Sequence, residues 1–187
     1  APHARRGSAA AVPWWCGMSM VELLELGEAI DSTDFRELMA KVPTSVAVVA
    51  GIDGGHPVGL TVGTFASVSL GPPLVSVCVA KTSQSWPRIV PAGLFSLSVL
   101  AAGQQDVCAA FATKGPDKFD AVDWEASRRG LPWIRGSVVH LDCALETEIE
   151  AGDHLIVVGR VLELSHGEEE APMVFHQRRL VGVRHDA

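Results

Sequence analysis

Hydrophobic and polar residues alternate over much of the chain, which is the pattern of strands that are buried on one face. Runs of this kind are PLVSVCVA (73–80), GLFSLSVL (93–100), LDCALETEI (141–149) and HLIVVGRVLEL (154–164). Turn residues at Asp53-Gly54-Gly55 and Gly152-Asp153 lie between neighbouring runs and indicate hairpins. The pattern predicts a mainly β fold, an antiparallel barrel with a few short peripheral helices.

Helical spacing is confined to three short segments. MVELLELGEAI (20–30) predicts one or two turns of amphipathic helix, and GQQDVCAAFA (103–112) predicts another short helix. In STDFRELMAKV (32–42) the apolar residues share one face, and Asp34 followed three residues later by Glu37 resembles a capping box. Helices are therefore expected only at the periphery of the sheet.

Composition limits the class of protein. The 187 residues are 48% hydrophobic and 20% charged, as in a globular domain with a real core. We interpret residues 1–30 as an N-terminal extension, partly disordered, and residues 31–187 as one domain. A net charge of −7 argues against nucleic-acid binding. No apolar run approaches the roughly 20 residues of a membrane span, so no membrane association is expected.

The sequence lacks the common catalytic motifs. No Rossmann glycine motif follows a strand, no P-loop, G-x-S-x-G or H-E-x-x-H occurs, and the histidines do not fall at metal-ligand spacing. We therefore predict no metal site, and the chemistry must either come from a bound cofactor or be missing. The four cysteines are widely separated, which suits a reducing cytoplasm better than a disulfide framework.

One strand-like stretch carries little side-chain bulk. In GLTVGTFASVSLGPPLVSV (59–77), small residues alternate with larger ones and would leave a flat shelf with exposed backbone donors and acceptors near residues 61–64. The isoalloxazine ring of a flavin needs such a plane and such partners. The alternative is a glycine-bearing corner of a barrel that binds nothing.

The next segment adds a polar turn. VAKTSQSWPRI (79–89) places Lys81, Ser83 and Ser85 at alternate positions before a proline-initiated helical turn, an arrangement that suits a phosphate. Taken singly, Ser85 is explained as a helix cap and Lys81 as a solvated side chain. Taken with the shelf, the segments resemble sites for the two ends of a flavin nucleotide.

These segments, with FATKGPDKF (111–119) and AGDHLIVVGRVLEL (151–164), resemble the short-chain flavin reductases of the split-barrel FMN-binding superfamily. The resemblance runs from about Phe35 to Val183 and is greatest to reductase components of two-component flavin-dependent monooxygenases. It implies a split β-barrel, a homodimer, and an NAD(P)H:flavin oxidoreductase. Such an enzyme reduces free flavin, FAD rather than FMN, with NADH. It supplies reduced flavin by diffusion to a separate oxygenase, in aromatic degradation or natural-product biosynthesis.

The resemblance also implies two sets of site residues. The flavin-binding set is Thr61, Val62, Gly63, Thr64, Ser67, Val79, Ala80, Lys81, Ser83, Ser85, Trp86, Ala110 and Phe111. The set expected at NADH is His154, Phe175, His176, Gln177 and Arg178, with His154 positioning the nicotinamide. The last four depart from the family pattern F-(Y/H)-R-G, because Gln177 precedes Arg178.

Three alternatives remain at this point. Without the family motif, His154 is better explained as a turn histidine that hydrogen-bonds Asp153 or the backbone. The whole protein is explained by a flavin- or haem-binding carrier or sensor without reductase activity. A β-barrel interaction module without any small ligand is a third interpretation. NADH-dependent bleaching of added flavin separates the reductase from the other two.

Overall fold

The computed structural model describes residues 19, 30–115, 118–167 and 171–183, in two compact units, 1–39 and 40–187. We describe each unit by itself. Most of the predicted 1–30 extension, including the helix expected at 20–30, lies outside the described residues.

The first unit contains helix α2 (Ser32–Met39), as predicted. The Asp31 carboxylate caps it by accepting the N–H groups of Thr33 (2.7 Å) and Asp34 (3.2 Å). These hydrogen bonds hold the pKa of Asp31 below its usual value. The expectation of a capping box at Asp34 is therefore wrong, because the helix begins earlier.

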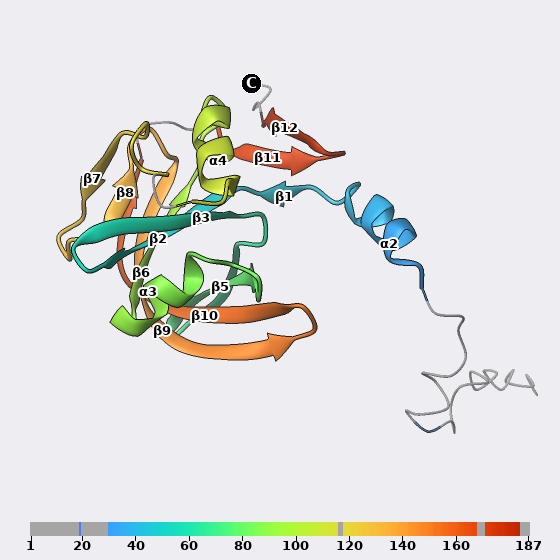
Figure 1. Cartoon of the computed structure of the whole chain (residues 1–187), viewed down its shortest axis with the longest axis horizontal. Coiled ribbons are helices and arrows are strands. Elements are labelled where there is room, and N and C mark those ends of the chain that lie inside the picture. The colour runs from blue at the N-terminus through green and yellow to red at the C-terminus, as the bar shows by residue number, and fades with distance from the viewer. Residues whose placement is uncertain (1–18, 20–29, 116–117, 168–170, 184–187) are drawn as a thin grey trace, which may run out of the picture. The chain divides into compact units, whose positions relative to one another are not determined.

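The second unit is built on a seven-stranded antiparallel sheet, within the described part of the chain, with strand order β3-β2-β6-β9-β10-β5-β4 (Figure 1). Its strands are β2 (Ala47–Asp53), β3 (His56–Val62), β4 (Ala66–Leu70), β5 (Pro73–Ala80), β6 (Leu94–Val99), β9 (Val139–Ala151) and β10 (His154–His166). Both predicted hairpins, β2–β3 and β9–β10, are present. The mainly β, antiparallel prediction is confirmed.

The sheet must curl strongly, because its first and last strands are consecutive in the chain. β3 ends at Val62 and β4 begins at Ala66, so a three-residue link joins opposite ends of the sheet. That link reaches about 14 Å when extended, whereas the ends of a flat seven-stranded sheet lie about 29 Å apart. The Thr64 hydroxyl in the link also accepts the N–H of Cys78 in β5, at 2.7 Å. The sheet is therefore curled in a barrel-like manner.

Two smaller sheets complete the β-structure that the model describes. One has the order β1-β11-β12, from β1 (Thr44–Ser45), β11 (Met173–His176) and β12 (Arg179–Gly182). The other pairs β7 (Trp124–Ala126) with β8 (Pro132–Ile134). The pairing of β1 with β11 was not predicted from the sequence, because it joins residues that are more than a hundred positions apart.

Short helices lie beside the curled sheet (Figure 1). They are α3 (Trp86–Ile89), the 3-10 turn η1 (Val90–Ala92) and α4 (Gln105–Ala112). The helix predicted over 103–112 is confirmed, and its buried residues are Cys108 and Phe111.

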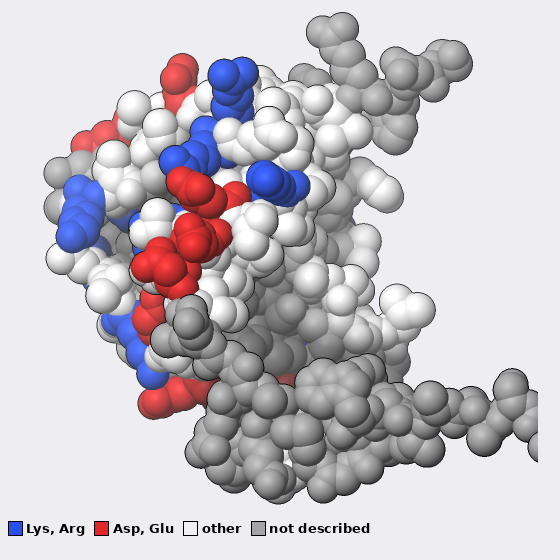
Figure 2. Space-filling model, turned by 90° about the vertical axis from the view of Figure 1, so that its right-hand side faces the viewer, with Lys and Arg blue, Asp and Glu red and all other residues white. Residues whose placement is uncertain are grey.

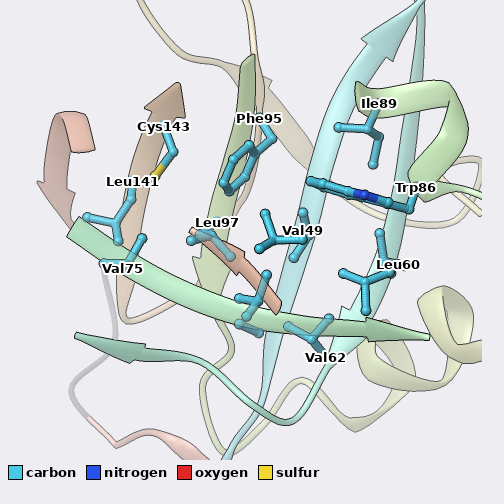
Figure 3. Close-up of a cluster of buried hydrophobic side chains, with 14 of the residues drawn as sticks. Val49, Leu60, Val62, Val75, Trp86, Ile89, Phe95, Leu97, Leu141 and Cys143 are labelled. Carbon is cyan, nitrogen blue, oxygen red and sulfur yellow. The ribbon is translucent and has the colours of Figure 1, made fainter. Parts of the chain in front are cut away.

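The buried apolar residues of this unit fall into two clusters. The first lies inside the curled sheet, and Figure 3 shows the Trp86 indole pointing into it between Ile89 and Leu60. The second contains Phe111, whose ring meets Phe119 edge to face with centroids 4.8 Å apart. Leu60 and Phe111 thus belong to different clusters.

Charged side chains are mixed on the face shown in Figure 2, where acidic and basic groups lie close together and much of the remaining described surface is uncharged. Ion pairs in the described residues include Arg160 with Glu146 at 2.9 Å and Lys81 with Glu150 at 3.0 Å. Over the described ranges, no helix has the length and apolarity needed to cross a bilayer.

Candidate functional site

A cavity of about 460 Å³ opens between β3, the β5–α3 turn and the C-terminal end of α4. The described residues lining it include three cations, Arg88, Lys114 and Lys118, and no carboxylate. The other lining residues are Leu60, Thr61, Ala80, Thr82, Ser83, Gln84, Ser85, Phe111, Ala112, Thr113 and Gly115. A cationic, hydroxyl-rich hollow without a described carboxylate suits an anionic ligand.

Lys118 connects three walls of this cavity. Its ammonium donates to the carbonyl oxygens of Gly59 and Phe111 and to the hydroxyl oxygen of Ser85, each at 3.2 Å. Partial burial lowers the pKa of Lys118 from its ordinary value, because desolvation disfavours the charged form. The other two cations differ: Arg88 pairs with Asp53 at 2.7 Å, and Lys114 is exposed.

The β5–α3 turn positions two serines on the cavity. Ser83 Oγ accepts the N–H of Trp86 at 3.2 Å, so Ser83 supplies the side-chain bond at the start of α3. Ser85 makes no such bond, although it occupies the N-cap position. The interpretation of Ser85 as a plain helix cap is therefore wrong, since its hydroxyl oxygen accepts from Lys118 instead.

Two residues near this turn face elsewhere. The Trp86 ring is 3% exposed and lies in the first core cluster, and its Nε1–H donates to Glu148 at 2.7 Å. Its contribution to a phosphate turn would therefore come from its backbone and not from its ring. Lys81 does not line the cavity, and its ammonium lies 3.0 Å from the Glu150 carboxylate.

Of the predicted shelf, residues 61–64 with Ser67, only Thr61 lines the cavity. Thr61 lines it and donates its hydroxyl to the Cys108 carbonyl of α4 at 3.1 Å. Val62 is a core residue, Thr64 is bonded to Cys78, and Ser67 is exposed on edge strand β4. These three residues do not line the cavity.

The remaining predicted flavin residues divide in the same way. Ala80 and Phe111 line the cavity, whereas Val79 is buried in the first cluster at 1% exposure. Ala110 packs against the second cluster. The cavity thus brings together five residues of the predicted flavin set: Thr61, Ala80, Ser83, Ser85 and Phe111.

The residues predicted at NADH lie at two places beside this segment. His154 begins β10 directly opposite Ala80, and its Nδ1 lies 2.7 Å from an oxygen of Asp153. The bond to Asp153 matches the simple turn-histidine interpretation. Because a carboxylate only accepts, Nδ1 carries the proton, and Nε2 of the neutral ring is left as an acceptor.

Phe175 and His176 lie in β11, where Phe175 is opposite Thr44. Gln177 and Arg178 form the following turn with φ of 49° and 61°, the left-handed conformation of a two-residue hairpin. A Cβ atom at Gly63 would lie 3.4 Å from Thr44 Oγ1. One residue of β1 thus lies between this stretch and the glycine of the shelf.

Several cavity residues were missed by the sequence analysis, namely Thr82, Gln84, Arg88, Thr113, Lys114 and Lys118. The two lysines lie in FATKGPDKF, a segment singled out only for its resemblance. A lysine in a polar loop carries no periodicity that separates a half-buried group from a solvated one. The sequence did place two lysines, Lys114 and Lys118, directly after Ala110 and Phe111, which were predicted to contact the flavin.

Comparison with known proteins identifies the family. A family model described as the flavin reductase like domain matches residues 39–184. The reductase subunit HsaB of a flavin-dependent monooxygenase from Rhodococcus jostii is 43% identical over 159 residues, 85% of this chain and 82% of that protein.

Two solved structures are also similar. Nitrilotriacetate monooxygenase component B from Mycobacterium thermoresistibile has a TM-score of 0.79 and 38% identity, over 84% of this chain and 89% of its own. The Streptomyces globisporus NADH:FAD oxidoreductase SgcE6, solved with NAD and FAD fragments, has a TM-score of 0.76 and 38% identity, over 86% of this chain and 98% of its own. The predicted family is confirmed: the chain belongs to the flavin reductase like domain family.

Proposed function

We propose that this protein is an NADH-dependent flavin reductase that reduces free FAD, in preference to FMN, and releases it to a separate flavin-dependent monooxygenase. The observation that carries the proposal is the cavity that contains Lys118 and Ser85. Three cations and five hydroxyl side chains line it, and none of its described lining residues is a carboxylate. The names of the similar proteins support the same activity: a monooxygenase reductase subunit and an NADH:FAD oxidoreductase.

The chain's residues fit a flavin nucleotide. Lys118, Arg88 and the serine hydroxyls suit its phosphate groups, and Ala80 and Ala112 add apolar surface to the same cavity. When bound, the flavin supplies the acceptor for the hydride that NADH gives up, and no protein acid or base is needed to break that C–H bond. The chain's work is to bind, orient and exclude water.

His154 is proposed to position the nicotinamide, and its tautomer suits this role. With Nδ1–H held by Asp153, the Nε2 lone pair can accept an N–H of the nicotinamide carboxamide. Phe175 pairs with Thr44, which lies beside Gly63 of the shelf, and Phe175–Arg178 is the proposed binding segment for the rest of NADH. NADH is proposed over NADPH by analogy with the similar oxidoreductase.

We also propose a homodimer. Strand β4 is an edge of the seven-stranded sheet and exposes Val68 and Leu70, at 53% and 93%. An open apolar edge of this kind needs a cover, and two-fold pairing is the commonest cover. Light scattering should return twice the chain mass of 19.8 kDa. A monomer would count against the dimer.

The cytoplasm is the proposed location. NADH and a reducing environment are available there. The three described cysteines, Cys78, Cys108 and Cys143, are all unpaired thiols, consistent with that environment.

The activity is tested by following NADH oxidation under anaerobic conditions with FAD, FMN or no flavin added. We expect oxidation and flavin bleaching only when a flavin is present, with a lower KM for FAD than for FMN. Binding of flavin without NADH oxidation would instead identify a carrier. Neither binding nor oxidation with either flavin would contradict the proposal altogether.

A further inference from the structure

We propose that Lys118 is a positioning residue that acts on the flavin phosphate through Ser85. The Lys118 ammonium donates a hydrogen bond to Ser85 Oγ, so the Ser85 hydroxyl can donate its own hydrogen to a bound anion. This inference rests on the flavin reductase function proposed above. It concerns a residue that the sequence analysis did not single out and that connects three walls of the cavity.

The donor count of Lys118 carries the first step. A lysine ammonium has three N–H donors and no acceptor. Gly59 O, Phe111 O and Ser85 Oγ, each 3.2 Å from Nζ, account for all three. Lys118 therefore has no N–H left over for a ligand and acts on a ligand through its charge and through Ser85.

The second step concerns the polarity of the serines. Because Lys118 only donates, Ser85 Oγ is the acceptor of their bond, and its own O–H remains available as a donor. In the described part of the chain, Ser85 Oγ makes no other hydrogen bond. Ser83 Oγ likewise accepts, from the Trp86 N–H, and keeps its O–H. Two hydroxyl donors two positions apart on one cavity wall suit the oxygens of a phosphate group.

The third step concerns charge balance. Lys118 forms no ion pair with any carboxylate in the described residues, whereas Arg88 on the same cavity pairs with Asp53. Among the described residues, this partly buried cation has carbonyl and hydroxyl partners and no counter-charge, and neutral partners compensate for burial of a charge only in part. A phosphate group in the cavity would supply the missing negative charge. The arrangement is therefore completed by an anion.

The experiment compares three ligands that differ in phosphate content: riboflavin with none, FMN with one and FAD with a diphosphate. Dissociation constants are measured by isothermal titration calorimetry without NADH, for the unmodified protein and for Lys118→Met, Ser85→Ala and the double variant. Lys114→Met is the comparison, because Lys114 lines the same cavity and has no described hydrogen bond to its other walls.

We expect Lys118→Met to weaken FMN and FAD by about tenfold or more, the loss of a charge-assisted interaction, and to change riboflavin less than about twofold. Ser85→Ala should weaken the same two ligands by a smaller factor. The double variant should lose no more than Lys118→Met alone, because the two residues act as one unit. Lys114→Met should cost less than Lys118→Met for FMN and FAD.

Equal losses for riboflavin, FMN and FAD in Lys118→Met would overturn the inference, since Lys118 would then only hold the cavity walls together. If Lys118→Met does not fold by circular dichroism, Ser85→Ala decides in the same way. Unmodified protein that binds no flavin at all would overturn the proposed function itself. That outcome differs from failure of the Lys118 inference, in which the unmodified protein binds flavin and the variants do not discriminate between ligands.

Discussion

Lys118 and Asp142 are both charged side chains drawn into the interior and joined to a serine, yet their surroundings differ. Asp142 is fully buried, with Oδ2 accepting from Ser127 Oγ at 2.6 Å and Oδ1 accepting from Trp133 Nε1 at 2.7 Å. Ser127 Oγ also accepts the N–H groups of Arg129 and Leu131. Lys118 meets Ser85 beside an open cavity instead.

The sign of the charge decides whether the serine hydroxyl hydrogen stays free to donate to a ligand. Asp142 can only accept while ionised, so it takes the single proton of Ser127, whose lone pairs are already used by backbone N–H groups. Lys118 can only donate, so Ser85 keeps its proton. A buried charge alone therefore does not mark a binding site. A binding site is marked by a donor or acceptor that faces a cavity and has no partner within the described residues.

The largest effect should follow from Asp142→Ala. This change leaves the buried Ser127 hydroxyl and the partly buried Trp133 N–H without their acceptor, which should lower the free energy of unfolding by about 2–5 kcal/mol. Urea unfolding measures it. The exposed Asp120→Ala is the control and should stay within about 0.5 kcal/mol of the unmodified protein. Flavin affinity of folded Asp142→Ala should be unchanged, and a selective loss of that affinity would break the comparison.

Lys118→Met should have the opposite profile. Without flavin, its free energy of unfolding should change by less than about 1 kcal/mol, because water in the cavity replaces the lost bonds and a desolvated charge is removed. With FMN at 100 times the dissociation constant of the unmodified protein, that protein should gain about 2.7 kcal/mol and the variant clearly less. A large loss of stability without ligand would make Lys118 as structural as Asp142.

A smaller effect should appear in the pH dependence of stability. Burial raises the pKa of Asp142 above its unfolded value of 3.8, so the folded state binds this proton more tightly than the unfolded state. This contribution to stability is present below pH 3.8 and is lost as the pH rises through the folded pKa. Asp142→Asn removes it, so the advantage of the unmodified protein over Asp142→Asn should grow as the pH falls from 7 toward 4 in urea titrations. A constant difference would contradict a raised pKa.

The smallest effect on stability is expected for His154→Ala, because His154 and Asp153 are both exposed. Its proposed role predicts a higher KM for NADH or slower hydride transfer, with flavin affinity unchanged. His56→Ala, at the exposed β2–β3 hairpin, is the matched control. Loss of flavin affinity with constant NADH parameters would place His154 at the flavin instead, and no change in either would leave it a simple turn histidine.

The sequence predicted local features well. The hairpins at 53–55 and 152–153 and the helix within 103–112 depend on turn residues and helical spacing inside short windows, and all three are present. Alternation in the run 141–149 predicts one apolar face and one polar face. This alternation places Asp142 on the polar face, yet Asp142 is fully buried. It is buried because the Ser127 hydroxyl and the Trp133 indole N–H, from a separate segment, donate to its carboxylate.

Features that depend on distant segments could not be predicted in this way. Trp86 reads as part of a polar turn, yet its ring completes a core made by strands before and after it. The pairing of Phe175 with Thr44 joins the two ends of the second unit. The sequence predicts a solvated loop lysine at Lys118, but β3, α4 and the β5–α3 turn each bring one oxygen atom to its ammonium.

The three bonds of Lys118 also bear on the order of events when the chain folds. They reach back 59, 33 and 7 positions, and β6 pairs with β9, with Leu94 opposite Ala144. Domains dominated by such distant pairings fold slowly, over milliseconds to seconds. The cavity walls come together only when these pairings are complete, so partly folded chains cannot bind flavin. A ligand that recognises only the finished state slows unfolding and leaves the folding rate unchanged. Flavin in the cell would therefore extend the lifetime of the native protein without helping new chains to reach it.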